Sequence, residues 1–130
     1  MQTLQVSAVL FAKQLTRLAG FYQAVFGLKP ARSDADHVLL RFDGFELVIH
    51  QIPKQLLASA SDDSPVERRE RSAIRLDFPI SDITYARREA NRLSGVIDDL
   101  PPPWTDGDAS FFLGQDPEGN VFGAKLTGTP

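Results

Sequence analysis

The chain of 130 residues has a net charge of −3 and no cysteine, which excludes disulfides, cysteine metal ligands and thiolate nucleophiles. A pI near 5.3 gives no electrostatic basis for binding nucleic acid or an anionic membrane. Hydrophobic residues make up 42% of the chain and include nine phenylalanines, enough for one packed domain. No apolar run near the N-terminus has the length of a signal peptide or a membrane span, so we expect a cytoplasmic protein.

The first half of the chain follows the order strand, helix, three strands. The helix is predicted over Leu15–Phe26, where apolar residues recur every three or four positions. Thr16 is its expected N-cap, and Gly27 stands where a left-handed residue ends a helix. Strands are predicted at Leu4–Ala12, Lys29–Asp34, His37–Phe42 and Phe45–Ile52, the last two joined at Asp43-Gly44.

The second half repeats this order after a polar connector at Lys54–Arg71. A helix capped by Ser81 or Asp82 ends at Gly95, as the first helix ends at a glycine. Strands are predicted at Ala73–Phe78, Val96–Leu100, Ser110–Gly114 and Asn120–Leu126. The duplication predicts an α+β fold of two tandem βαβββ modules, about 4–53 (module one) and 72–127 (module two), with a linker at 54–71.

The last two strands meet at Asp116-Pro117-Glu118-Gly119-Asn120. Asp in the first position, Pro in the second and Gly in the fourth suit a type I turn, because Pro presets φ and the Asp side chain bonds backbone two residues on. This segment therefore predicts a tight hairpin that closes the sheet of module two.

Two segments carry a resemblance to a known family: LTRLAGFYQAVFGL at Leu15–Leu28 and QDPEGNVFGAKL at Gln115–Leu126. Both resemble signature segments of the vicinal oxygen chelate superfamily, which includes glyoxalase I, extradiol dioxygenases and the fosfomycin- and bleomycin-resistance proteins. The element order fits over essentially the whole chain. The resemblance implies a cup-shaped mixed sheet with the helices outside, a small-molecule site inside and a homodimer.

Enzymes of that superfamily hold a divalent metal in the cup, with ligands from the first and last strands of each module. The corresponding positions in this sequence are Ser7, Val48, Ala73 and Gly123. Three of these side chains have no donor atom, and a neutral serine hydroxyl is a poor ligand beside imidazole and carboxylate. The resemblance and this substitution pattern together predict that the cup holds no metal cofactor and has no catalytic residues.

Other residues do not rebuild such a site in the sequence. Glu46 and His50 share a strand face but lie roughly 13 Å apart along an extended strand, too far to hold one ion together. His37, the only other histidine, is expected to be an ordinary surface or hairpin residue.

Strand alternation predicts which side chains line the cup. Positions 74, 76 and 78 are apolar and are expected to pack under a helix, which turns Arg75 and Asp77 into the cup. Arg75 then forms either an internal network with Asp77 or Glu46, or a contact with an anionic or polar ligand group. The candidate ligand-binding residues are Ser7, Val9, Phe11, Glu46, Val48, His50, Arg75, Asp77, Trp104, Phe112, Gly123 and Lys125.

Three of these assignments leave alternatives open. Trp104, after three prolines, forms either a lid or wall over the cup, or a cover for the core edge or a dimer seam. Gly123 either leaves room for a ligand or is a packing glycine. Phe111 and Phe112 alternate across their strand, so one of them faces the cup; Phe112 is taken as the candidate, although the pattern does not decide between them.

We therefore expect a metal-free small-molecule-binding protein of the glyoxalase and bleomycin-resistance type, which sequesters an organic ligand. The sequence favours binding over catalysis. One alternative is a metal-dependent lyase, isomerase or dioxygenase with unusual ligands. Another is a degenerate cup kept for its dimer surface or a protein partner. The ligand's identity, and whether modules pair within a chain or exchange between subunits, do not follow from the sequence.

Overall fold

The computed structural model describes residues 5–57 and 66–127. Module one consists of β1 (Val6–Ala12), α1 (Leu15–Phe26), β2 (Lys29–Ser33), β3 (His37–Phe42) and β4 (Phe45–Gln51). Module two consists of β5 (Leu76–Ile80), α2 (Ile83–Arg92), β6 (Val96–Ile97), β7 (Phe111–Gln115) and β8 (Val121–Leu126). Single 3-10 turns, η1 (Lys54–Leu56) and η2 (Pro103–Thr105), lie in the connecting segments.

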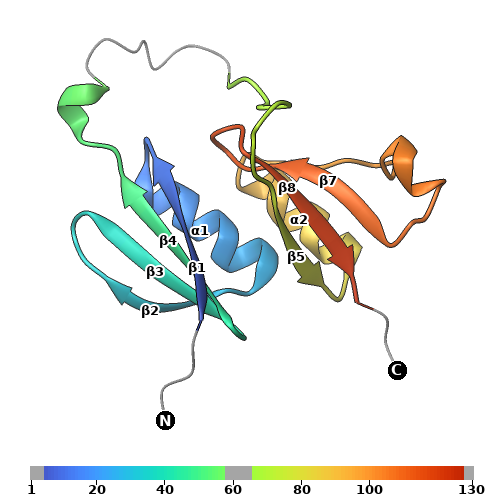
Figure 1. The fold of residues 1–130 in the computed structure, drawn as a ribbon, viewed down its shortest axis with the longest axis horizontal. Coiled ribbons are helices and arrows are strands. Elements are labelled where there is room, and N and C mark those ends of the chain that lie inside the picture. The colour runs from blue at the N-terminus through green and yellow to red at the C-terminus, as the bar shows by residue number, and fades with distance from the viewer. Residues whose placement is uncertain (1–4, 58–65, 128–130) are drawn as a thin grey trace.

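Each module forms its own four-stranded mixed sheet (Figure 1). The strand order is β1-β4-β3-β2 in one and β5-β8-β7-β6 in the other, with the first and last strands of each module paired in parallel. The two orders are equivalent element by element. The predicted two-module α+β fold is therefore confirmed.

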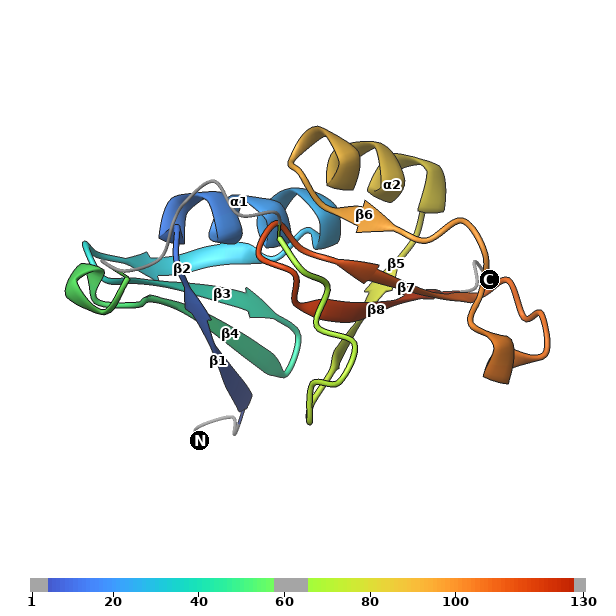
Figure 2. The ribbon, with the colours of Figure 1, turned by 90° about the horizontal axis from the view of Figure 1, so that it is seen from above.

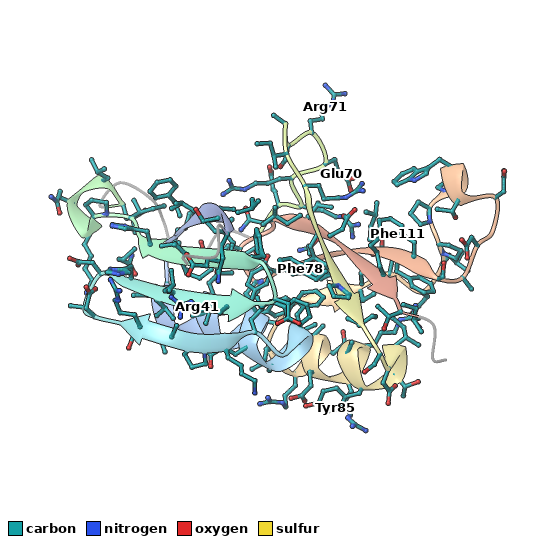
Figure 3. The ribbon with its side chains drawn as sticks, turned by 60° about the horizontal axis from the view of Figure 1, so that its bottom comes forward. Arg41, Glu70, Arg71, Phe78, Tyr85 and Phe111 are labelled. Atoms are coloured by element: carbon teal, nitrogen blue, oxygen red, sulfur yellow. The ribbon has the colours of Figure 1, made fainter. Side chains whose placement is uncertain are left out.

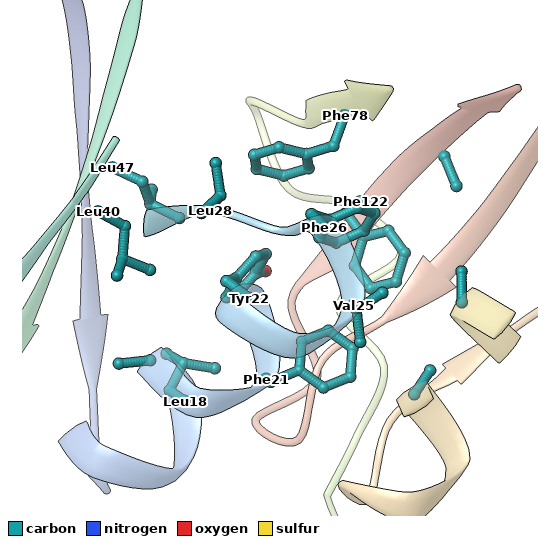
Figure 4. Packing of buried hydrophobic residues seen from close by; sticks show 14 of the residues in the cluster. Leu18, Phe21, Tyr22, Val25, Phe26, Leu28, Leu40, Leu47, Phe78 and Phe122 are labelled. Carbon is teal, nitrogen blue, oxygen red and sulfur yellow. The ribbon is translucent and has the colours of Figure 1, made fainter. Parts of the chain in front are cut away.

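Helix α1 joins the two sheets into one core (Figure 4). Its Tyr22 and Phe26 contact Phe78 and Phe122 of module two, with the Phe26 and Phe78 rings stacked at 4.6 Å between centroids. Its buried Leu18 lies on the side of the first sheet. Full burial of a side chain of this size contributes about 1.5–3 kcal/mol, so α1 is the main link between the modules.

The turn between β7 and β8 clasps α1 from the other module. The hydroxyl of Tyr22 donates to Oδ2 of Asp116 at 2.7 Å, and Asp116 is fully buried. The two carboxylate oxygens of Glu118 accept hydrogen bonds from the backbone amides of Lys13 and Gln14, at 2.8 and 2.9 Å. A charged residue of module two thus satisfies amides at the start of a helix in module one.

This clasp explains why the predicted N-cap is wrong. The helix begins at Leu15 with Gln14 as N-cap, and the Gln14 side chain makes no capping bond. Side chains from distant parts of the chain accept the hydrogen bonds at the helix start. Glu118 accepts from Lys13 and Gln14, and Gln51 accepts from the Leu15 amide at 3.0 Å. Thr16 is left inside the first turn and exposed.

Gly27 does end α1 in the left-handed conformation, with φ of 69°. The end of α2 differs from the prediction, because Ser94 takes the positive φ and Gly95 does not. Gly95 is needed for space: a Cβ there would collide with the Phe21 ring and lie 2.7 Å from the carbonyl oxygen of Gln115. The N-cap of α2 is Asp82, one of the two predicted residues, which accepts from the amide of Tyr85.

Strand β5 begins at Leu76, not at Ala73 as predicted. Among the described strands its sheet neighbour is β8, which begins at Val121, and Leu76 pairs with Phe122. By this register Arg75 is level with Val121, and residues 73 and 74 are level with the hairpin turn, where there is no strand to pair with. As a result Ile74, expected under a helix, is 77% exposed.

Both helices lie on one side of the two sheets and contact each other, as Figure 2 shows. The opposite sheet faces, which carry the predicted cup residues, are open to solvent in a single chain: Val9, Phe11 and Trp104 are 52, 61 and 62% exposed. Within residues 5–57 and 66–127, no helix is long and apolar enough to cross a membrane.

Candidate functional site

An aromatic–arginine cluster, made of Arg75, Asp77, Trp104 and Phe111, lies on the open face of module two. The Arg75 guanidinium carbon is 5.2 Å from the centroid of the Phe111 ring and 5.9 Å from that of Trp104. Its Nε and one terminal nitrogen donate to Asp77 at 2.6 and 3.1 Å. A cation so placed on two aromatic rings gains cation–π attraction at both.

The internal pair that the sequence left as one alternative for Arg75 is therefore formed, with Asp77 as the partner. The hydrogen bonds that Arg75 donates to Asp77 raise the pKa of Arg75, so the guanidinium stays charged throughout the physiological range. The pair occupies one edge of the guanidinium, formed by Nε and one terminal nitrogen, and Arg75 remains exposed. Among the described residues the other terminal nitrogen makes no side-chain hydrogen bond and is the donor left for a ligand.

Gly123 lies beneath this cluster and is buried. A Cβ at this position would collide with the Asp77 carboxylate and lie 2.7 Å from the Phe111 ring. The side chains of Asp77 and Phe111 thus fill the space that a larger residue would take. Of the two alternatives for Gly123, the structure favours the packing glycine.

The choice of Phe112 as the cup-facing aromatic is wrong. Phe112 is buried on the helix side, where the guanidinium carbon of Arg87 lies 4.6 Å from its ring. Phe111 takes the open face instead (Figure 3), directly across the strand pair from the exposed Lys125. Nothing in the local sequence shows which of the two adjacent phenylalanines faces the open side, because the strand alternation is apolar at both positions.

The open face of module one carries the remaining candidates. Ser7, Val9 and Phe11 are exposed on β1, and Val48 is half-buried on β4. Glu46 does not reach Arg75: its Oε2 accepts from Nε of Arg41 on the neighbouring strand at 2.8 Å. The aromatic and charged residues thus divide between the two modules. Trp104, Phe111 and Arg75 belong to module two, and Phe11, His50 and Glu46 belong to module one.

The internal duplication shows which residue of module two is equivalent to Ser7 of module one. Val9 pairs with Val48 in module one, as Asp77 pairs with Gly123 in module two. The residue two places before that pair is Ser7 in β1 and Arg75 next to β5, so Arg75, and not Ala73, matches Ser7. With this equivalence, the four positions that the resemblance predicts for metal ligands are Ser7, Val48, Arg75 and Gly123.

These side chains do not fit a divalent metal. A fixed guanidinium charge at one of the four positions repels a cation, and two of the others have no donor atom. Among residues 5–57 and 66–127, no group of three or more His, Cys, Asp or Glu side chains is placed to hold an ion.

Comparison with known proteins agrees with the fold and the paired modules. A family model described as a glyoxalase-like domain matches residues 7–124. The chain belongs to the glyoxalase-like domain family. Its membership places it in the vicinal oxygen chelate superfamily, as the two signature segments indicated.

Solved structures similar to this glyoxalase-like chain share its fold at low identity. A glyoxalase/bleomycin resistance protein from Albidiferax ferrireducens T118 is 16% identical with a TM-score of 0.63, covering 95% of this chain and 98% of its own. The fosfomycin resistance protein FosX from Listeria monocytogenes, in complex with Mn(II) and 1S,2S-dihydroxypropylphosphonic acid, is 14% identical with a TM-score of 0.66, covering 98% and 92%.

A glyoxalase-related enzyme from Fulvimarina pelagi is 19% identical with a TM-score of 0.60, covering 98% of this chain and 89% of its own. No curated protein sequence matches the chain.

Proposed function

We propose that this glyoxalase-like protein binds a small organic molecule without the metal of its superfamily and sequesters it. The observation that carries the proposal is Arg75. It is the residue equivalent to Ser7, carries a positive charge and lies 5.9 and 5.2 Å from the ring centroids of Trp104 and Phe111. A cation beside two aromatic rings suits a planar aromatic molecule with an anionic group, which would stack on a ring and meet the guanidinium.

We further propose that the binding cup forms in a homodimer. In one chain the two open faces do not cover each other, because both helices lie on the same side. If modules exchange, the module-one face of one copy closes over the module-two face of the other. Phe11 and Val9 would then cover the aromatic–arginine cluster of the partner and bury apolar surface now exposed. A cytoplasmic location stays a prediction of this proposal.

Trp104 makes binding measurable, because it is the only tryptophan in the chain and belongs to the cluster. Its fluorescence is titrated with a panel of planar aromatic carboxylates, such as benzoate, hydroxybenzoates and indole carboxylates, in buffer containing EDTA. The proposal expects at least one saturable change in emission. It expects this response to be lost in Arg75→Ala while the variant keeps its thermal unfolding transition.

Arg92→Ala is the matched control, because it also removes an arginine from an Arg–carboxylate pair, on the outer helix α2. It should titrate as the unaltered protein does. A panel that gives no response in EDTA but a saturable one after Mn²⁺ is added would overturn the proposal in favour of a metal-dependent lyase, isomerase or dioxygenase.

A further inference from the structure

We propose that His37 and His50 form a two-histidine site for a divalent transition metal such as Zn²⁺ or Ni²⁺. The two residues lie directly opposite each other on the antiparallel strands β3 and β4. Opposed residues project from the same face of a sheet with Cβ atoms about 5 Å apart. Their rings are stacked at an interplanar angle of 11°, with centroids 6.2 Å apart.

An oxygen atom close to Nδ1 sets each imidazole in the form that binds metals. Nδ1 of His37 lies 2.9 Å from Oδ1 of Asp34, and Nδ1 of His50 lies 3.0 Å from the carbonyl oxygen of Gln51. A carbonyl oxygen only accepts, and an ionised carboxylate does too, so each Nδ1 carries the proton of the neutral ring. Each Nε2 is then the nitrogen with a free lone pair, and an oxygen partner behind a histidine is the usual support for a metal ligand.

The surroundings suit an ion that enters from solvent. Both histidines are half-buried, and Phe11 lines one side with its ring centroid 6.0 Å from that of His50. Bonds of about 2.0–2.1 Å to one ion require the two Nε2 atoms within about 4 Å of each other, so binding an ion would tilt the rings together out of their stack. Imidazole favours zinc, nickel or copper over calcium and magnesium.

This site is distinct from the four superfamily positions and from the aromatic–arginine cluster. His50 is two residues beyond Val48 on β4, pairs with Phe11 at the far end of β1 from Ser7, and lies on the other sheet from Arg75. Among the described residues no third His, Cys, Asp or Glu completes it. The ion would keep open positions for water or a ligand, and the inference does not depend on the proposed function.

The chain has only these two histidines, so imidazole-dependent binding has one possible origin. Untagged protein is freed of metal with EDTA, exchanged into buffer, and titrated calorimetrically with ZnCl₂ and with NiCl₂. We expect one ion per chain. His37→Gln and His50→Gln should each weaken binding at least tenfold, because one imidazole cannot chelate, whereas Glu89→Gln, an acidic residue on α2, should bind as the unaltered protein does.

A second measurement needs no variant. Nitrogen-15 spectra of the unaltered protein should show both imidazoles perturbed on addition of Zn²⁺, at Nε2 more than at Nδ1. Absence of binding in the titrations, a single variant that binds as tightly as the unaltered protein, or a spectrum in which only one imidazole or neither responds would each overturn the proposal.

Discussion

Tyr22→Phe tests the contact that fastens the two modules together. The substitution removes one hydroxyl and leaves the aromatic packing of Tyr22 against Phe26, Phe78 and Phe122 in place. It takes one donor from Asp116, which also accepts from the Asn120 side chain and from two backbone amides. All four bonds favour the ionised carboxylate, while burial, the largest influence, raises the pKa of Asp116.

A hydrogen bond to a charged group contributes about 1.5–3 kcal/mol to stability. Leaving a buried carboxylate without one of its donors costs a similar amount. We expect Tyr22→Phe to lower the free energy of unfolding by about 2 kcal/mol, which for a chain of this length is a decrease in Tm of about 6–10 °C. Urea unfolding followed by far-UV circular dichroism measures the loss, and an unchanged m value confirms that the transition is comparable.

Tyr85→Phe is the matched control for the same chemical change. Tyr85 is 45% exposed on α2, and its backbone amide, which phenylalanine keeps, donates the hydrogen bond to the N-cap Asp82. It should change stability by less than about 0.5 kcal/mol. If Tyr22→Phe lowers the free energy of unfolding no more than Tyr85→Phe does, the hydrogen bond between Tyr22 and Asp116 does not stabilise the packing of the two modules.

Glu118→Gln should destabilise the protein by about 0.5–2 kcal/mol and speed hydrogen exchange of the Lys13 and Gln14 amides, which donate to the carboxylate. Unchanged exchange at these two amides would contradict the capping role. Gly95→Ala should cost more than about 2 kcal/mol by denaturant unfolding because its Cβ has no room, whereas Gly20→Ala, with nothing within 4 Å, should stabilise by about 0.5–1 kcal/mol; similar effects at both would contradict the packing. Burial raises the pKa of Tyr22 well above 10.0, so the fold retains a proton that the unfolded chain releases and stability falls as pH rises past 10.0. In Tyr85→Phe, phenol ionisation followed at 295 nm should coincide with alkaline unfolding, and a separate earlier step would contradict this.

Local patterns were enough to predict the fold. Two helices with apolar stripes, glycines near their ends, and an Asp-Pro-Glu-Gly turn are all short-range signals, and their repetition gave the two modules. The predicted N-cap of α1 was wrong because amides at the start of the helix bond to Glu118 and Gln51, side chains far along the chain. The predicted start of β5 was wrong because residues 73 and 74 are level with the hairpin turn before β8.

The candidate site was predicted less completely, for a related reason. Alternation placed Arg75 and Asp77 on the open face, but the rings that flank Arg75 come from a loop and from another strand. The pairing of His37 with His50 depends on the register between two strands, which residue types alone do not specify. The hairpin at Asp43-Gly44 was the one signal from which that register could have been counted.

A crystal structure grown with Mn²⁺ and the carboxylate that binds most tightly in the fluorescence titration would show whether Arg75 or a metal ion holds the ligand. Metal-free binding predicts the aromatic ring of the ligand against Trp104 and Phe111, its carboxylate at the Arg75 guanidinium, and no anomalous manganese signal among Ser7, Val48, Arg75 and Gly123. A manganese ion coordinated among those four residues would contradict metal-free binding.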